Sequence, residues 1–234
     1  MPEIPNNAPL ISPIGSLTSD TSPILERDIV FADFASLADE QQGIVASWLR
    51  QRTSEVNNML NVEEDDVRKK HLGIVAMKAI VTADEQTSYA IVGYIGATQP
   101  EEHRGEQMSE EHEGEQMSEV GSLYVEKAHR KHEVMIDTID EATGEIITKP
   151  MRISMALAYY ATKMLEEQGI IAYAFCNEGS YPIFNELGFK ESSLSAVPPK
   201  AGELCKADCK LYQACHPDDC CDTIMVKDLP KSKK

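Results

Sequence analysis

Apolar residues recur with two different periods along the chain, and the periods predict strands and helices in a mixed order. Runs of apolar and β-branched residues bounded by turn residues predict strands. We expect strands at 26–34, 72–81, 88–98, 120–125, 170–176 and 221–229. Helical spacing predicts helices after Ser36, around 54–70 and over 152–169, and a short helix with Ser180 as N-cap that ends before Gly188.

The order of these elements predicts the fold class. The strands at 72–81 and 88–98 are joined by a short polar segment, which favours an antiparallel pair. The second half alternates strand, helix, strand, helix and strand, which favours right-handed crossovers between parallel neighbours. A hairpin at 133–151 interrupts this alternation, with Gly144 at the left-handed turn position. We therefore expect an α/β fold with a mixed, mostly antiparallel twisted sheet and helices on both faces.

A tandem duplication precedes the strand at 120–125. The sequence EHRGEQMSE, from Glu102 to Glu110, is followed at once by EHEGEQMSE, from Glu111 to Glu119. We interpret the segment as a solvated acidic loop that grew by copying. The alternative is a soft-metal clamp made of His103, Met108, His112 and Met117.

Composition narrows the classes of partner. The 234 residues include 22 Lys and Arg against 39 Asp and Glu, a net charge of −17 that repels nucleic acid. No apolar run approaches the roughly 18 residues that span a bilayer, so we expect no membrane partner. The proline-rich N-terminus has no basic signal segment, which favours a cytoplasmic location. We divide the chain into a disordered tail, 1–24, and one domain, 25–234, with insertions at about 100–118 and 133–151 and a cysteine-rich segment at 205–221.

A motif near the C-terminus carries a family resemblance. Five residues resemble the N-x-x-A-x-x-L-Y-x-x-x-G-F signature of the GNAT N-acetyltransferase superfamily: Asn177, Ser180, Phe184, Gly188 and Phe189. IVGYIGAT resembles the third strand of that family, and SLYVEKAHRK resembles its fourth strand and the start of its pyrophosphate loop. The resemblance covers roughly Ile29 to Leu229. It implies a GNAT-like fold, acetyl-CoA as donor, an amine as acceptor and direct transfer between them.

The pyrophosphate loop departs from the family pattern. Glycines normally let the backbone approach a phosphate closely, but Glu133 and Met135 occupy the small positions of R/Q-x-x-G-x-G/A. We favour a loop split by the hairpin, and the alternatives are a loop that resumes after the hairpin or one that has decayed and binds no nucleotide. With the split loop, the resemblance implies these cofactor-binding residues: Leu123, Tyr124, Val125, Arg130, Lys131, Arg152, Ile153, Ser154, Met155, Asn177 and Phe184.

Two residues are candidates for catalysis. GNAT enzymes that use a glutamate base often carry it where the fourth strand opens, which points to Glu119; a partly buried carboxylate can take a proton from an ammonium group. The alternative is that Glu119 exists only as the repeat copy of Glu110. Phe184 stands where the family has a tyrosine that protonates the departing thiolate. Tyr181, three residues earlier on the same helix face, is either its substitute or a packing residue.

The cysteines indicate a metal site. Five of the six lie within 205–221, and disulfides are disfavoured in a reducing compartment. Their spacing can surround one tetrahedral structural zinc. The first choice of ligands is Cys205, Cys209, Cys215 and Cys220, with Cys221 or His216 as alternates; free thiols or a redox-sensitive pair are the other interpretation.

Two functional hypotheses follow. The first is an acetyl-CoA-dependent N-acetyltransferase that acts on a primary amine of a small molecule or peptide. The second is a catalytically silent acyl-CoA-binding module that uses its hairpin and cysteine segment for partner contacts. The sequence leaves the amine acceptor unidentified and a homodimer open.

Overall fold

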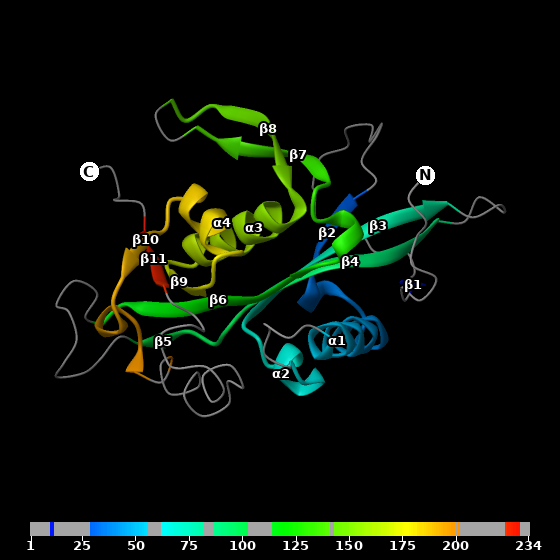
Figure 1. Ribbon diagram of the computed structural model, residues 1–234, viewed down its shortest axis with the longest axis horizontal. Coiled ribbons are helices and arrows are strands. Elements are labelled where there is room, and N and C mark those ends of the chain that lie inside the picture. The colour runs from blue at the N-terminus through cyan, green and yellow to red at the C-terminus, as the bar shows by residue number, and fades with distance from the viewer. Residues whose placement is uncertain are drawn as a thin grey trace.

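The computed structural model describes residues 10–11, 29–55, 62–81, 87–102, 114–140, 143–199, 201 and 223–229. Within them the chain forms a large sheet, a separate hairpin and helices (Figure 1). The elements are β1 (Leu10–Ile11), β2 (Ile29–Asp33), η1 (Phe34–Ser36), α1 (Asp39–Ser54), α2 (Glu64–Arg68), β3 (Leu72–Val81), β4 (Thr87–Ala97), β5 (Glu101–Glu102), β6 (Gln116–Val125), η3 (Lys127–His129), β7 (Glu133–Ile139), β8 (Ile146–Arg152), α3 (Ile153–Glu167), β9 (Ile171–Cys176), α4 (Tyr181–Glu186), β10 (Lys190–Ser192), η4 (Leu194–Ala196) and β11 (Thr223–Lys227).

The sheet confirms the expected fold class. Its strand order is β10–β11–β9–β6–β4–β3–β2, with β1 beside β4 and β5 beside β6. Every neighbouring pair is antiparallel except β6 and β9, which are parallel and joined through α3. A parallel pair needs such a crossover, because a tight turn can join only antiparallel strands. The alternation of elements in the second half of the sequence therefore predicts this pair correctly. The same expectation is wrong for the last unit, because β9 and β11 are antiparallel.

Helices cover both faces of the sheet. In Figure 1, α3 and α4 lie on one face and α1 and α2 on the other. The main core lies under α3 and includes Ile153, Leu157 and Leu165, none of which is exposed. A second core lies under α1, where Leu49 packs with Tyr94 of β4. Burial of these apolar side chains is the main favourable term that holds the helices to the sheet.

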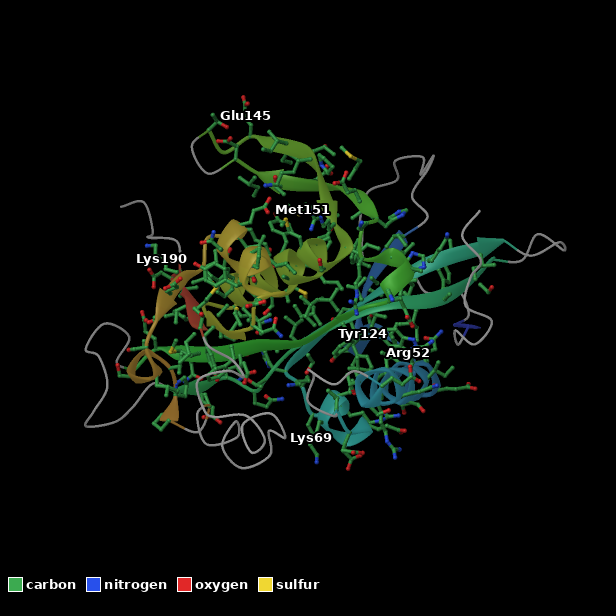
Figure 2. All side chains as sticks on the ribbon, viewed as in Figure 1. Arg52, Lys69, Tyr124, Glu145, Met151 and Lys190 are labelled. Carbon is green, nitrogen blue, oxygen red and sulfur yellow. The ribbon has the colours of Figure 1, made fainter. Side chains whose placement is uncertain are left out.

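The hairpin β7–β8 forms where the sequence predicts an insertion. Glu133 lies opposite Arg152 at its base, and Gly144 takes the left-handed turn position with a φ of 75°. Met151 is buried against Ala156 of α3 and points from the hairpin toward that helix (Figure 2). The hairpin is therefore a flap packed on α3, and its two ends are held together at the base.

The predicted start of the first helix is wrong. Ser36 is the last residue of η1, and α1 begins at Asp39 after the N-cap Ala38. The Ala38 N–H donates to Gln41 Oε1 at 3.1 Å, so a glutamine in the first turn satisfies the backbone that Ser36 was expected to cap.

Most of the predicted tail and insertion segments lie outside the described residues. The described part of the tail is β1, which pairs with Tyr89 and Ala90 of β4. Residues 103–113 and 202–222 are not described, so neither the soft-metal clamp nor the zinc ligands can be placed. No helix in the described ranges is long and apolar enough to cross a membrane.

Candidate active site

Strand β6 changes its partners along its length. Met117 to Glu119 pair in parallel with Ile171 to Tyr173 of β9. From Val120 to Val125, among the described strands, β6 pairs with β4 alone. Backbone N–H and C=O groups on the β9 side of this part are therefore not used by a strand. An extended ligand with amide groups can bond to such an edge, as peptides do when they add to a sheet.

A bulge lies where the two strands part. Tyr94 of β4 lies opposite Tyr124, and Gly96 lies opposite Gly121, so β6 holds one more residue than β4 between these pairs. Ser122 has a φ of 55°, a left-handed conformation that is uncommon outside glycine. Because a bulge bends its strand and increases the twist, this one explains why the end of β6 turns away from β9.

The loop after β6 is tied to the strand and to α1. Glu126 Oε1 lies 2.7 Å from Nε of Arg52 on α1, and both side chains are largely buried. Arg130 Nε donates to the carbonyl of Val125 at 3.1 Å. Tyr124 lies between the sheet and α1 close to Arg52 (Figure 2) and packs edge-on against Trp48, with ring centroids 5.5 Å apart. The loop therefore has a defined path.

The hairpin rejoins the two halves of the predicted split loop. The Ile153 N–H, at the start of α3, donates to the carbonyl of His132 at 3.2 Å. Arg130 and Lys131 are thereby brought beside Arg152, although about 20 residues separate them in sequence. The structure thus places the three predicted cationic side chains at one end of α3.

The N-terminus of α3 offers free backbone donors there. Its N-cap, Arg152, has an extended backbone and makes no side-chain capping bond, so the N-cap side chain does not accept from the N–H groups of Ser154 and Met155. These donors and the helix dipole favour an anion. Burial, with Lys78 and His132 nearby, lowers the pKa of His129, so its imidazole is neutral near pH 7 and adds no charge. Exposed Arg130, Lys131 and Arg152 give this end positive charge, and exposed Glu133, opposite Arg152, offsets part of it.

The side chains of several predicted cofactor-binding residues are packed in the hydrophobic core. Val125, Ile153 and Phe184 are buried in the main core, and Leu123 packs against it. Tyr124 is buried on the opposite face, in the core under α1. Only the backbone of Leu123, Tyr124 and Val125 is free to face a ligand beside β6.

Glu119 lies at the point where β6 leaves β9. It is opposite Tyr173, and its N–H donates to Thr98 Oγ1 at 3.0 Å. Burial raises the pKa of its carboxyl group, and the charge of Lys70 partly opposes this shift. The carboxylate makes no ion pair with any residue in the described ranges. A carboxyl group with a raised pKa and no fixed partner suits a general base.

The α4 region differs from the expectation. Ser180 is the N-cap residue of α4, as predicted, but its side chain makes no capping bond. Asn177 Oδ1 accepts from the N–H groups of Gly179 and Ser180, both at 3.0 Å, so Asn177 caps the turn before the helix. Tyr181 Oη donates to Glu191 at 2.6 Å, and this bond is the main reason why the pKa of Tyr181 is raised. Phe184 is 2% exposed and packs edge-on against Phe189. Each of these side chains has a structural partner.

Two residues missed by the sequence reasoning lie near Glu119. Tyr94 of β4 is fully buried and its hydroxyl has no hydrogen-bond partner among the residues that the structure describes, while Lys70 precedes β3. The available signal was the pair of glycines inside strand patterns, Gly73 and Gly96, because glycine within a strand often marks the close approach of another group.

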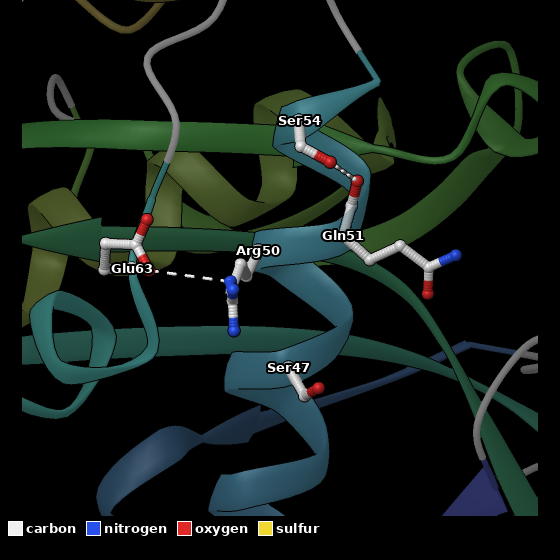
Figure 3. A pocket seen from close by; sticks show the side chains of 5 residues that line it. All are labelled: Ser47, Arg50, Gln51, Ser54 and Glu63. Atoms are coloured by element: carbon white, nitrogen blue, oxygen red, sulfur yellow. Dashed lines mark hydrogen bonds and ion pairs between the residues drawn. The ribbon is translucent and has the colours of Figure 1, made fainter.

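Two hollows on the surface contain none of the predicted site residues. One, of about 390 Å³, lies along α1 and is crossed by the pair of Arg50 and Glu63 at 3.5 Å (Figure 3). The other, of about 520 Å³, lies between the hairpin and the outer face of α3. In the described ranges no group of three or more His, Cys, Asp and Glu side chains is placed to hold a metal. Cys176 is buried, and burial raises its pKa to about 11, so it remains a thiol.

Comparison with known proteins shows similarity at the level of structure. No protein-family model and no curated protein matches the chain. Arabidopsis thaliana NAA60, solved with acetyl-CoA, matches with 10% identity and a TM-score of 0.47 over 70% of this chain and 86% of that chain. A GCN5-related N-acetyltransferase from Ralstonia eutropha matches with 13% identity and a TM-score of 0.42 over 73% of this chain and 97% of that chain. Both belong to the class that the sequence motif resembles, and matches of this strength carry no functional argument of their own.

Proposed function

We propose that the chain is an acetyl-CoA-dependent N-acetyltransferase that acts on the primary amine of a small molecule or peptide. The observation that carries this proposal is the parting of β6 from β9 after Glu119, with the start of α3 joined to the loop that follows β6. A strand edge without a strand partner, a helix start beside cationic residues and a buried carboxyl group on the same strand support the proposal, because the sequence resemblance implies these parts. The donor is a co-substrate that supplies a thioester-bound acetyl group.

The residues present fit such a donor in two places. Past Glu119, the backbone of Leu123 to Val125 can bond the amides of a pantetheine arm, although the Val125 carbonyl is taken by Arg130. The first-turn N–H groups of Ser154 and Met155 face the same end of α3 as Arg130, Lys131 and Arg152, and this combination suits a pyrophosphate. Cationic side chains would thus supply much of the phosphate binding that a glycine-rich loop provides through its backbone N–H groups.

Glu119 is the proposed general base. An ammonium group must lose its proton before its nitrogen can attack the thioester carbon, and the carboxylate can take that proton directly or through a water. The new C–N bond forms as the C–S bond breaks, and the sulfur leaves as thiolate. Because burial raises the pKa of Glu119, its conjugate acid is weaker than an exposed glutamic acid and its carboxylate is a stronger base.

No hydroxyl in the α4 region is free to protonate the departing thiolate. Tyr181 would have to break its 2.6 Å bond to Glu191, and Phe184 has no proton to give. General acid catalysis contributes about 10²–10⁴-fold, whereas the effective molarity of two bound reactants reaches about 10⁵–10⁸ M. A thiol with an ordinary pKa of about 8.5 leaves tolerably as its anion. We therefore propose transfer with Tyr181 at most an auxiliary acid, so Tyr181→Phe should lower kcat by less than about 10-fold.

The same observation on α4 favours a second candidate, the catalytically silent acyl-CoA-binding module. One experiment separates the two. Thermal unfolding with and without acetyl-CoA measures donor binding, and release of free CoA across a panel of amines measures transfer. A rise in unfolding temperature with amine-dependent CoA release supports the enzyme. A rise with no release for any amine supports the silent module, and no rise with either CoA or acetyl-CoA refutes both.

A further inference from the structure

The hollow between the hairpin and α3 has an apolar wall that is open to solvent. Its volume is about 520 Å³, within the range of sites that take a ligand or a few side chains. On the hairpin side, Ile139 is 57% exposed and lies opposite Ile146, which is 74% exposed. Four of the five large apolar side chains that are exposed in the described ranges belong to this hairpin. Exposed apolar side chains gathered in one place are typical of a binding surface.

The rest of the wall is mainly acidic. Glu166 is paired on both sides, because its carboxylate lies 2.8 Å from Lys163 Nζ and 2.9 Å from Lys227 Nζ. Asp137 and Glu167 also line the hollow, are exposed and form no ion pair within the described ranges. The last turn of α3 has no basic residue, and the negative end of the helix dipole adds to the charge of its glutamates. The hollow therefore suits a segment that combines apolar stems with positive charges.

A segment of this kind follows β11. This strand ends at Lys227, opposite the start of β9, which follows α3 after a short turn. The contact of Lys227 with Glu166 shows that the end of β11 already touches the wall of the hollow. The described chain continues to Leu229, and residues 230–234 have the sequence PKSKK, with three lysines in an otherwise acidic protein. Five extended residues span about 16–18 Å, which is enough to bring these lysines from Leu229 to the hollow.

We propose that residues 230–234 dock in this hollow and fasten the tip of the hairpin to α3. Lysine ammonium groups pair with Asp137 and Glu167, and the methylene stems cover Ile139 and Ile146. A second copy is a poorer occupant, because a net charge of −17 makes two copies repel each other. A basic segment of another protein offers the same chemistry, but a segment tethered beside the site has an effective concentration in the millimolar range.

The docked segment holds the hairpin at the end opposite to its base. At the base, Met151 packs against Ala156 of α3, and Arg152 lies opposite Glu133. The tip, which lies over α3 in Figure 1, has only the exposed side chains of the hollow to hold it. With both ends held, the hairpin keeps one position on α3. This inference concerns how the hairpin is held and does not depend on the proposed activity.

Cross-linking with a carbodiimide identifies the occupant. The reagent joins a carboxylate to a lysine amine only where the two are in contact, and peptide mapping of the full chain locates the link. We expect protein of monomer mass to carry links to Asp137 or Glu167 from Lys231, Lys233 or Lys234. Links found only in cross-linked dimers would make a second copy the occupant. Links only to acidic residues outside the hollow would show that the segment does not dock there, and either result overturns the inference.

Hydrogen exchange of the hairpin amides measures the fastening. Replacing all three lysines of 230–234 with glutamate should speed exchange in β7 and β8 about 3–10-fold, the range of a few exposed ion pairs. In 1 M salt, where the screening length is about 3 Å, the wild-type chain should exchange as fast as this variant. The control variant carries Lys69→Glu and Lys190→Glu, at lysines that are 74% and 82% exposed and do not line the hollow. It should leave the hairpin rates unchanged.

Charge reversal on the other side of the contact completes the test. Glu167→Lys should speed hairpin exchange by itself, and its combination with the three-glutamate variant should restore slow exchange, because the charges are opposite again. Glu167 is exposed at the end of α3, so its replacement should not prevent folding. Unchanged hairpin exchange in the three-glutamate variant, or no recovery in the combination, would show that the inference is wrong. None of these measurements uses acetyl-CoA or an amine, so such a result would leave the proposed acetyltransferase standing.

Discussion

Breaking the ion pair between Arg52 and Glu126 should destabilise the chain and loosen the loop after β6. Arg52 Nε and Glu126 Oε1 are 2.7 Å apart, and the side chains are 14% and 11% exposed. Their contact has ion-pair distance without hydrogen-bond geometry, since neither atom has a hydrogen-bond partner within the described ranges. Arg52→Met keeps much of the length of the side chain and its packing but leaves the Glu126 carboxylate buried without its counter-charge.

Removing one partner of a buried pair costs about 3–5 kcal/mol, and we expect the lower end because the geometry is imperfect. For a chain of this size about 3 kcal/mol corresponds to a fall of roughly 6–12 °C in Tm. The matched control is Arg50→Met on the same helix. Its partner Glu63 and its own side chain are 63% and 58% exposed, so the control should cost at most about 1 kcal/mol.

The measurement is the free energy of unfolding from urea titrations of the two single variants and of the double variant Arg52→Met with Glu126→Gln. The double variant should recover most of the unfolding free energy that Arg52→Met loses, because it leaves no buried charge behind. Acetyl-CoA affinity should fall in Arg52→Met and stay normal in Arg50→Met, since Glu126 begins the loop that carries Arg130. If Arg52→Met and Arg50→Met are equally stable, the pair does not fix this loop and the reasoning is wrong.

Three further predictions concern the site and the metal. Glu119→Gln should lower kcat by about 10²-fold or more with little change in acetyl-CoA affinity. Because burial raises the Glu119 pKa, the wild-type rate should climb with pH through that raised value, and the same climb in the variant would refute the assignment. Replacing Arg130 and Arg152 with alanine should weaken CoA about 2–5-fold per contact and pantetheine less; equal losses would show that they do not touch phosphate. Elemental analysis should find about one zinc per chain, bound by Cys205, Cys209, Cys215 and Cys220, and metal-free protein with five rapidly reacting clustered thiols would end that idea.

The sequence predicts much of the fold because period and order are local properties. The helix at 153–167 has its apolar positions at helical spacing, and the structure buries Ile153, Leu157 and Leu165. The parallel pair β6–β9 follows from the crossover between them. Helix starts are harder to predict, since several polar side chains compete to satisfy the same N–H groups. Gln41 takes the capping role that the pattern gives to Ser36, whereas Ser180 is the N-cap of α4 as predicted, without a side-chain capping bond.

The candidate site is predicted in outline but not in its cross-strand part. A motif that runs along the chain points to Glu119, Arg130 and Arg152 as candidates. Lys70 and Tyr94 come together with Glu119 only through the register of three strands, which no single-segment pattern contains. Tyr181 is a candidate acid because helical spacing puts it on the same face of α4 as Phe184. That spacing does not show that Glu191 of β10 would accept a hydrogen bond from its hydroxyl.

The hairpin explains how a loop without glycines can still form an anion site. Inserting about 20 residues into a loop would normally separate its two ends, and closing a longer loop costs entropy. Here β7 and β8 pair along the whole insertion, from Glu133 opposite Arg152 at the base to Ile139 opposite Ile146 near the turn. The Ile153 N–H donates to the His132 carbonyl and joins the two chain segments at the base. The two ends of the loop are therefore as close as in a short loop, without requiring any residue to adopt a glycine conformation. In the proposed function, phosphate recognition then depends on long, exposed cationic side chains, whose charge is screened by salt. An anion site built in this way tolerates Glu133 and Met135 at its small positions, so the missing glycines are not an argument against nucleotide binding.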